Sequence, residues 1–500
     1  MRRAAPVNHP TADTLSRLAS RYAIVVLLVA FGGVYYSTLG SYGMFIWDEA
    51  HYATLGRALH RGLGYTDFSG AAEAFRPPVL PASVALAMSI VGGESDVTAK
   101  LPILVFALAC LLLVYRTVER EHGVFGGIVA ACSLAVFPTF WSATGKLLTE
   151  IPFMLFYAAA VFAFQRGLER HPAAFVVAWL SFAAALLTRY TAVLYGPTLI
   201  AMTLLILLLC GRPVLRRLLT WQALISPLIA AVILLPWLGW VWVNRGDPLW
   251  GFREASAQIP LYSSHGAQPV YYYLTILPQM LGWPLAALLA AAVVHAVAAR
   301  DRLSLSSLVA AGVIIGWMTQ YAWKEPRLVT AVLPFVAVVL GVTAAAALRF
   351  VRSHKEVAPW QHAIGAAALA AAVWTVYSNH QAVDFVFRHQ VALGYPSFLQ
   401  AMRDLRDRTA PGDLVVGPNC YQIHWYADLP CHFTPNEPDR LAPLLADADW
   451  FVAVNFERGQ PPYVRELVKR FRRAEIANGH IRVFQDKRNR TVVAPANLVP

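Results

Sequence analysis

Acidic and basic side chains recur together at the ends of apolar segments of this sequence. Trp47–Tyr52 (WDEAHY) opens a long polar stretch that Phe75–Pro78 (FRPP) closes. Cationic side chains suit a phosphate or pyrophosphate, and an isolated carboxylate at the head of a helix suits a general base. The pattern predicts one shared site that binds a phosphorylated ligand and accepts a proton. Further charged residues of this kind are Lys146, Glu150, Arg189, Arg245, Asp247, Arg253, Glu254, Lys324, Glu325 and Arg327.

Two of these segments are expected to begin helices. Pro326 suits the first helical position, so Lys324 and Arg327 either share one face or flank the N-terminal end, where anions are favoured. Glu150 begins another helix, whose dipole stabilises its carboxylate.

Simpler interpretations remain open for these residues. Asp48 and Glu150 could each cap a helix, and His51 could be a polar packing residue. Arg189 could extend its charge to the membrane surface from a tight turn. Other open interpretations are lipid-headgroup anchoring for Lys324 and Arg327, and simple solvation for Asp67 and Glu73.

The elements that position these residues are predicted to cross a membrane. The 500 residues are 57% hydrophobic and 14% charged, whereas soluble domains carry about 25% charged residues. Including a first span near 22–40, eleven apolar runs have a suitable length. The other ten lie near 98–115, 123–142, 151–168, 173–189, 192–210, 221–243, 271–298, 303–322, 328–347 and 360–378.

The distribution of arginines predicts the orientation of the chain. The run from Pro77 to Val91 is short and starts with two prolines, which favours an interfacial or re-entrant helix. Leaving it out places the N-terminus and the basic clusters between spans on the cytoplasmic side. The formal net charge of +12 then reflects membrane orientation, which argues against a nucleic-acid partner.

Two domains are predicted. Residues 1–380 form a transmembrane catalytic domain with a long first outer loop, 41–97, and residues 381–500 form a small extracytoplasmic, periplasmic α/β domain. Cys420 and Cys431 fall in the second domain, where a disulfide can form. Strands are expected at 413–417, 449–455 and 480–485, and helices at 397–408, 439–446 and 462–473.

Several short motifs resemble those of one enzyme superfamily. They are Asp48–Tyr52 (DEAHY), Arg76–Pro78 (RPP), Ala99–Pro102 (AKLP), Thr149–Pro152 (TEIP) and Lys324–Pro334 (KEPRLVTAVLP). In this order they resemble the GT-C superfamily of integral membrane glycosyltransferases, over about residues 22–350. The most similar members are bacterial enzymes related to protein O-mannosyltransferases and to the lipid A aminoarabinose transferase. The resemblance implies a polytopic α-helical fold of about eleven transmembrane helices with a C-terminal α/β domain.

The resemblance also implies an activity. A hexose or pentose would pass, with inversion, from a polyprenyl-phosphate-linked donor to an acceptor hydroxyl of lipid A, a cell-envelope glycan or a protein. The reaction would take place on the outer face of the cytoplasmic (inner) membrane, among its lipids. Asp48 matches the base of the family, Glu150 a second acidic residue, and Arg76 a phosphate contact.

The other site residues follow from the implied mechanism. Lys324 and Arg327 fall in the region associated with the lipid phosphate, and Arg189 could also hold it. Glu49 or Glu150 could stabilise positive charge on the sugar. His51 stands where the aminoarabinose transferases carry Arg, and Phe75 where they carry an acidic residue. These positions bear on phosphate and metal binding, so a divalent metal and that particular sugar both stay open.

Two other functions fit many spans with outer cations. A lipid-linked saccharide flippase or transporter should line both leaflets with charge and often shows inverted repeats. No internal repeat is evident, and the candidate polar groups lie at outer ends, which favours the enzyme. An O-antigen polymerase or ligase would use a diphosphate-linked oligosaccharide instead.

Overall fold

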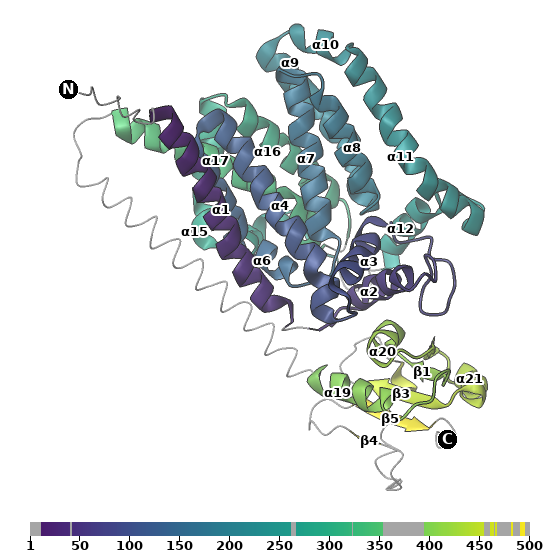
Figure 1. Ribbon diagram of the computed structural model, residues 1–500. Coiled ribbons are helices and arrows are strands. Elements are labelled where there is room, and N and C mark those ends of the chain that lie inside the picture. Colours follow the sequence, from purple (N-terminus) through teal and green to yellow (C-terminus); the bar gives the residue numbers. More distant parts are fainter. Residues whose placement is uncertain are drawn as a thin grey trace, which may run out of the picture.

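The computed structural model describes most of the chain as a bundle of helices with a small sheet beyond one end (Figure 1). The sheet belongs to the C-terminal region, residues 395–495. The expected last span, 360–378, and the expected strand ends at 480–481 and 484–485 lie outside the described residues. The described residues are 12–40, 43–261, 267–322, 324–353, 395–454, 461–464, 466–467, 482–483 and 491–495.

Six helices in the described part of the chain are long and apolar enough to cross a membrane, or seven if one bent pair counts as a span. The chain is therefore a multi-pass membrane protein, and the expected α-helical fold class is confirmed. The total of eleven spans stays a prediction. The six segments are Tyr22–Leu39 in α1 (Ala12–Leu39), Asp96–His122 (α4), Glu150–Glu169 (α7), Tyr190–Cys210 (η1 and α9), Trp221–Arg245 (α11) and Pro326–Val351 in η3 and α17 (Leu333–Ser353).

Shorter helices complete the bundle. Several are apolar but have fewer than 18 residues, and others lie at the bundle ends. Their bounds are α2 Trp47–His60, α3 Val79–Val91, α5 Val124–Val136, α6 Pro138–Thr144, α8 Ala174–Leu186, α10 Pro213–Leu218, α12 Trp250–Leu261, α13 Tyr272–Thr275, α14 Leu277–Leu281, α15 Trp283–Ala298 and α16 Arg302–Met318.

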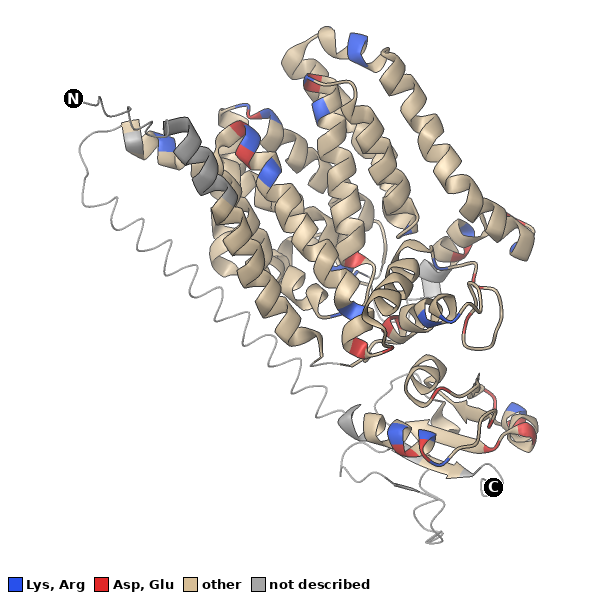
Figure 2. Cartoon of the chain, in the orientation of Figure 1, with Lys and Arg blue, Asp and Glu red and all other residues tan. Residues whose placement is uncertain are grey.

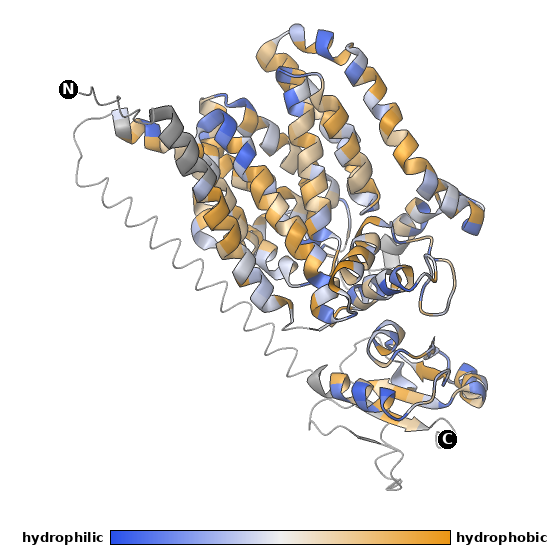
Figure 3. Cartoon of the chain, viewed as in Figure 1, coloured by the Kyte–Doolittle hydropathy of each residue, from blue (hydrophilic) through white to orange (hydrophobic). Residues whose placement is uncertain are grey.

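Charged residues gather at the two ends of the bundle, and the middle is apolar (Figures 2 and 3). The basic clusters between predicted spans lie together at the end away from α2. Contacts across this end include Arg170 with Glu121, 3.7 Å apart, and His122 with Asp301, 3.3 Å apart. An uncharged belt between charged ends is the pattern of a protein that spans a bilayer.

Two predicted spans are interrupted. The axis bends by 67° between α5 and α6, where Pro138 begins the second helix. The predicted span 271–298 is likewise divided, into α13, α14 and α15. Gly282 between the last two has a φ of +84°, a left-handed conformation that an unbroken helix cannot contain. Pro278 and Pro284 also lack the backbone N–H that a continuous helix needs.

Close packing in the bundle depends on small residues. A Cβ on Gly341 of α17 would lie 2.6 Å from the carbonyl oxygen of Gly126 in α5 and 2.6 Å from Cβ of Ala130. Glycine thus lets the two helix backbones touch, as is common where membrane helices associate.

The pair α2 and α3 lies at the end of the bundle that faces the C-terminal region (Figure 1). α3 starts directly after Pro77 and Pro78 and has 13 residues, too few to cross a bilayer. This agrees with the expectation of a non-spanning helix there. This arrangement brings Trp47–Tyr52, which opens the first polar stretch, into contact with Phe75–Pro78, which closes it.

The C-terminal region contains a five-stranded sheet with the order β2-β1-β3-β5-β4. β1 is parallel to β2 and β3, whereas β5 is antiparallel to β3 and β4. The strands are β1 Val415–Gly417, β2 Cys431–Phe433, β3 Trp450–Val454, β4 Arg482–Val483 and β5 Thr491–Pro495, and the helices are α19 Tyr395–Arg406, α20 Cys420–Ala427, η4 Pro438–Arg440 and α21 Leu441–Asp447.

The sequence did not predict three of these elements: β2, β5 and α20. A disulfide joins Cys420 at the start of α20 to Cys431 at the start of β2. The expected helix 462–473 is described only at 462–464 and 466–467, which are helical.

α20 docks on α2 through a small set of polar contacts. The Arg57 guanidinium donates to the carbonyl oxygen of Trp425 at 2.6 Å and lies 4.0 Å from the centre of its ring. Trp425 Nε1 and Tyr426 Oη donate to the carboxylate of Asp96 at the start of α4. These contacts fix the C-terminal region on the end of the bundle that carries the first polar stretch.

Candidate active site

A cavity of about 370 Å³ opens beside α2, at the end of the bundle near the C-terminal region. Its polar lining contains five of the eight residues selected from the sequence, drawn from four segments of the chain. They are Asp48, Arg76, Glu150, Arg189 and Arg327.

Asp48 lies in the first turn of α2, and its carboxylate contacts two cations. Arg76 Nη2 donates to Oδ1 at 2.7 Å, and Arg327 Nη1 lies 3.7 Å from Oδ2. The N-cap of the helix is Ile46, two residues before Asp48, so the interpretation of Asp48 as the N-cap is wrong. Burial alone would raise the pKa of Asp48, but the two guanidinium charges outweigh it and hold the pKa below its ordinary value. Asp48 is therefore ionised at neutral pH.

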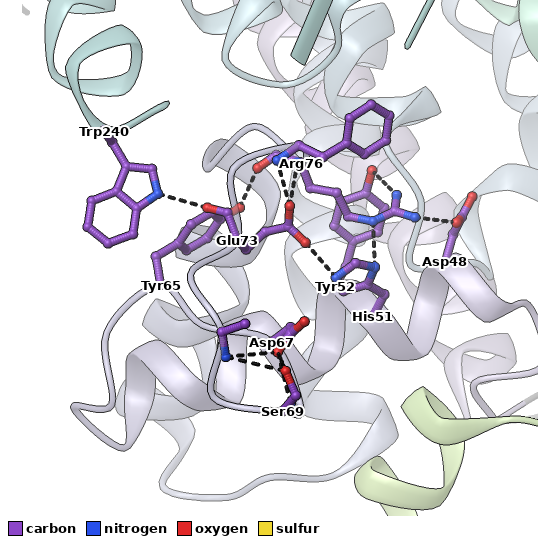
Figure 4. Close-up of polar contacts among 11 residues, drawn as sticks. Asp48, His51, Tyr52, Tyr65, Asp67, Ser69, Glu73, Arg76 and Trp240 are labelled. Carbon is purple, nitrogen blue, oxygen red and sulfur yellow. Dashed lines mark hydrogen bonds and ion pairs between the residues drawn. The ribbon is translucent and has the colours of Figure 1, made fainter. Parts of the chain in front are cut away.

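Arg76 is held in a fixed orientation by its neighbours (Figure 4). Besides Asp48, its guanidinium donates from Nε to His51 Nδ1 at 2.6 Å and from Nη1 to Tyr52 Oη at 3.1 Å. The backbone is held as well, because Tyr65 Oη donates to the Arg76 carbonyl oxygen at 2.7 Å. A guanidinium pre-oriented in this way can contact an oxyanion without first being ordered.

His51 supports Arg76 and does not line the cavity. Because Nδ1 accepts from Arg76, the neutral ring carries its proton on Nε2, which lies 2.9 Å from Glu73 Oε2. Burial and the charge of Arg76 lower the pKa of His51 below its ordinary value, even though Glu73 opposes this. His51 is thus neutral at pH 7, and the prediction that it binds phosphate directly gives way to a supporting role.

Glu73 was interpreted as a solvated loop residue, and the structure contradicts this. Its side chain is 9% exposed, and its Oε1 accepts from the backbone N–H groups of Phe75 and Arg76 at 2.6 and 3.1 Å. Burial would raise the pKa of Glu73, but contact with His51 and the two N–H groups lower it to about 2. Asp67, by contrast, forms a turn with Ser69 and Ala71, within the exposed loop.

Glu150 and Arg189 form the second ion pair of the cavity. Arg189 Nη1 donates to Glu150 Oε1 at 3.2 Å, and Oε2 has no protein partner within the described residues. Glu150 is 5% exposed and Arg189 21% exposed. Arg189 therefore has a partner inside the protein and does not simply reach for the membrane surface.

Two selected residues point elsewhere. Glu49 accepts from the backbone N–H groups of Ile46 and Leu147, and its Oε1 lies 3.6 Å from Lys100 Nζ. Lys324 donates from Nζ to the carbonyl oxygens of Gln268 and Tyr321. The predictions that Glu49 acts on the sugar and that Lys324 holds phosphate are therefore not supported by the geometry.

Of the two arrangements expected for Lys324 and Arg327, the structure shows the second, in which the two residues flank the start of a helix. η3, Pro326–Val332, begins after Lys324, as the proline indicated. Arg327 turns into the cavity, where it contacts Glu325 and Asp48, whereas Lys324 anchors the preceding loop.

The remaining lining of the cavity is mostly apolar and aromatic. Much of it comes from η1, α12, α16 and the start of η3. Trp317 and Val193 belong to this lining and are also exposed large hydrophobic side chains. The charged wall and the apolar wall together suit an amphipathic ligand. The apolar lining includes Phe75, Tyr190, Val193, Leu194, Phe252, Trp317, Met318 and Leu328.

A metal site was left open by the sequence. The described residues contain no group of three His, Cys, Asp or Glu side chains placed to hold a metal ion. The two carboxylates that line the cavity are each paired with arginine, so they do not form such a site in this arrangement.

Comparison with known proteins places this site in a known fold. Residues 75–240 match the family model described as dolichyl-phosphate-mannose-protein mannosyltransferase. Comparison by sequence with curated proteins finds no match. The chain also resembles solved structures of membrane transferases in its fold, and this agrees with the fold that the GT-C resemblance implies.

Two structures define the similarity more closely. ArnT from Cupriavidus metallidurans bound to undecaprenyl phosphate matches with a TM-score of 0.69 and 17% identity, over 94% of this chain and 97% of ArnT. The oligosaccharyltransferase of Archaeoglobus fulgidus matches with a TM-score of 0.56 and 13% identity, over 87% of this chain and 69% of that one.

Proposed function

We propose that the protein is an inverting glycosyltransferase that moves a monosaccharide from a polyprenyl-phosphate-linked donor to an acceptor hydroxyl. The observation that carries the proposal is the position of Asp48 between Arg76 and Arg327, in a cavity that is charged on one wall and apolar on the other. Such a cavity matches a ligand with an anionic head and a hydrocarbon tail. The family model and the similarity to ArnT, a protein solved with undecaprenyl phosphate, support the same ligand class.

The donor phosphate would compete with Asp48 for the two guanidinium groups. Arg76 and Arg327 each present several N–H donors in a planar fork that fits phosphate oxygens. When the phosphate takes these donors, Asp48 loses part of the stabilisation that lowers its pKa. Donor binding would thus make Asp48 a stronger base at the moment when a base is needed.

The proposed chemical step uses these three side chains. The acceptor oxygen attacks the anomeric carbon, its proton passes to Asp48, and the bond between that carbon and the phosphate oxygen breaks. Arg76 and Arg327 hold the departing polyprenyl phosphate. Because the nucleophile and the leaving group occupy opposite faces of the sugar, the configuration at the anomeric carbon inverts.

Glu150 would act on the sugar. Glu150 lines the cavity, and its buried Oε2 has no hydrogen-bond partner among the described residues, so a sugar hydroxyl that reaches it would supply the missing donor. Its negative charge would also stabilise the positive charge that develops at the anomeric carbon. Arg189 keeps the carboxylate oriented through the 3.2 Å contact.

We place the reaction on the outer face of the inner membrane. The arginine clusters lie at the bundle end opposite the cavity (Figure 2), and such clusters favour the cytoplasmic side. The acceptor is a hydroxyl of lipid A, an envelope glycan or a protein. The predicted domain boundary near residue 380 belongs to the same proposal.

The decisive experiment uses the purified full chain in nanodiscs with a radiolabelled polyprenyl-phosphate hexose or pentose. Release of labelled sugar to water or to an added acceptor, lost in Asp48→Asn, is the expected result. Movement of intact donor between leaflets without cleavage would identify a transporter instead. Indifference to every monophosphate donor, together with turnover of a diphosphate-linked oligosaccharide, would identify a polymerase or ligase.

A further inference from the structure

The C-terminal region contributes an aromatic ring to the support of the phosphate-binding wall. Tyr421 of α20 stacks on the ring of His51, with 4.0 Å between ring centres and an angle of 17° between the planes. We infer that Tyr421 is a positioning residue, which orients Arg76 for the donor phosphate by holding His51 in place. This inference rests on the proposed function, because it assigns Arg76 to the donor phosphate.

The contacts form a continuous path from Tyr421 to the cavity. The plane of the His51 ring is fixed by the stacked tyrosine, and the edge of the ring accepts the hydrogen bond from Arg76 Nε at 2.6 Å. Arg76 in turn reaches Asp48 at 2.7 Å. If the His51 ring tilts, Nε of Arg76 loses its acceptor while Nη2 still contacts Asp48. The guanidinium then rotates.

Tyr421 is itself held firmly. It follows Cys420, which the disulfide to Cys431 ties to the sheet. Its ring also contacts the rings of Trp47, Phe68 and Phe433 at centre distances between 4.8 and 5.8 Å. A ring fixed on several sides can transmit its position to His51, which a mobile surface side chain could not do.

The stack also shields His51 from water. The charged and titratable groups that face the imidazole are Arg76 and Glu73 from the outer loop, Asp48 from α2 itself, and Tyr421 from α20. Protonation of His51 would place an N–H on Nδ1 against the N–H of Arg76, and the hydrogen bond between them would be lost. Removing the Tyr421 ring would expose His51, so its pKa should rise toward the ordinary value.

The test measures binding of undecaprenyl phosphate, without sugar, to the detergent-solubilised full chain. Tyr421→Leu should weaken this affinity on the order of tenfold, because one charge-assisted hydrogen bond loses its geometry. Tyr421→Phe keeps the stacked ring and should bind undecaprenyl phosphate with the wild-type affinity. Phe433→Leu removes one of the rings around Tyr421 but leaves the stack on His51, so it should weaken binding far less than Tyr421→Leu does.

Two further measurements distinguish positioning from general loss of structure. Between pH 5 and 8, the decline in affinity on the acid side should begin at a higher pH in Tyr421→Leu than in the wild type. In a His51→Gln background, Tyr421→Leu should add no further loss, because its effect passes through His51.

The possible failures are distinct. If the wild type does not bind undecaprenyl phosphate, the proposed function fails. If the wild type binds and Tyr421→Leu binds equally well with an unchanged pH profile, only the positioning role is overturned. A full additional loss in the His51→Gln background would overturn it as well, and this double variant stays informative even if Tyr421→Leu lowers overall stability.

Discussion

Asp48 and Arg76 form an ion pair with 2.7 Å between Oδ1 and Nη2, in the wall of a cavity that is also lined by Arg189 and Arg327. The residues come from opposite ends of the first polar stretch and meet because the loop after α2 returns to the N-terminal end of that helix. α3 then runs parallel to α2, with Val84 beside Gly56 and Ser89 beside His60. The pair keeps the carboxylate ionised, yet it also engages the guanidinium that the donor phosphate would need.

The first prediction follows from this competition. Asp48→Asn should lower the turnover number by about 10²–10⁴-fold, the usual contribution of a general base. It should leave the affinity for polyprenyl phosphate unchanged or tighter, because Arg76 is then released from its carboxylate partner. Single-turnover kinetics and direct binding measure the two effects separately. Asp67→Asn, in the exposed loop, is the matched control; full turnover in Asp48→Asn would refute the role of Asp48 as base.

The second prediction concerns Glu150 and Arg189. Arg189→Leu leaves the buried Glu150 carboxylate without its partner, and this should destabilise the protein by about 3 kcal/mol. Adding Glu150→Gln removes the unpaired charge, so the double variant should regain much of its thermal stability. It should not regain turnover, because the charge near the sugar is gone. Recovery of both properties would show that the pair serves structure alone.

The third prediction is a dependence of stability on pH. The folded-state pKa of His51 is lowered below 6.5, and that of Glu73 is lowered to about 2 from 4.5. In both cases the unfolded chain binds more protons than the folded chain within these intervals, so stability falls as pH falls. The loss should begin below pH 6.5 and continue between pH 4.5 and 2. Thermal unfolding across this range should show a smaller decline in a Glu73→Gln variant; an equal decline would contradict the assignment.

The fourth prediction tests the contact between α5 and α17. Gly341→Ala introduces a Cβ 2.6 Å from Ala130 and from a backbone oxygen, so overpacking should cost about 1–3 kcal/mol. Gly312→Ala in α16 meets no atom within 4 Å and should be neutral or slightly stabilising. Unfolding of both variants in the same detergent provides the comparison. Equal stability of the two would mean that the helices are not packed at Gly341.

The sequence predicted the parts of the site that depend on local pattern. Asp48, Arg76, Glu150 and Arg327 could be selected because charge at the end of an apolar segment is costly unless it has a use. Lys324 and Glu49 have the same signature, but their partners are loop carbonyl oxygens and Lys100, which only the folded chain brings near.

Long-range contacts explain what the sequence could not indicate. Glu73 is flanked by alanines in a polar loop, and its burial depends on His51 and on Trp240, which donates to its carbonyl oxygen. Tyr421 lies in a short helix whose pattern gave no signal. The one local clue was the pair of cysteines beside it, since a disulfide fixes a neighbouring side chain in place.

The stack of Tyr421 on His51 has a consequence for biogenesis. Its two rings are encoded near opposite ends of the polypeptide, and the loop that must close between them contains nearly all of the transmembrane helices. Closing so long a loop is slow and comes late in folding. A nascent chain that still lacks α20 therefore lacks the stack on His51, and the proposed donor site would be completed only after the helices of the bundle have been made.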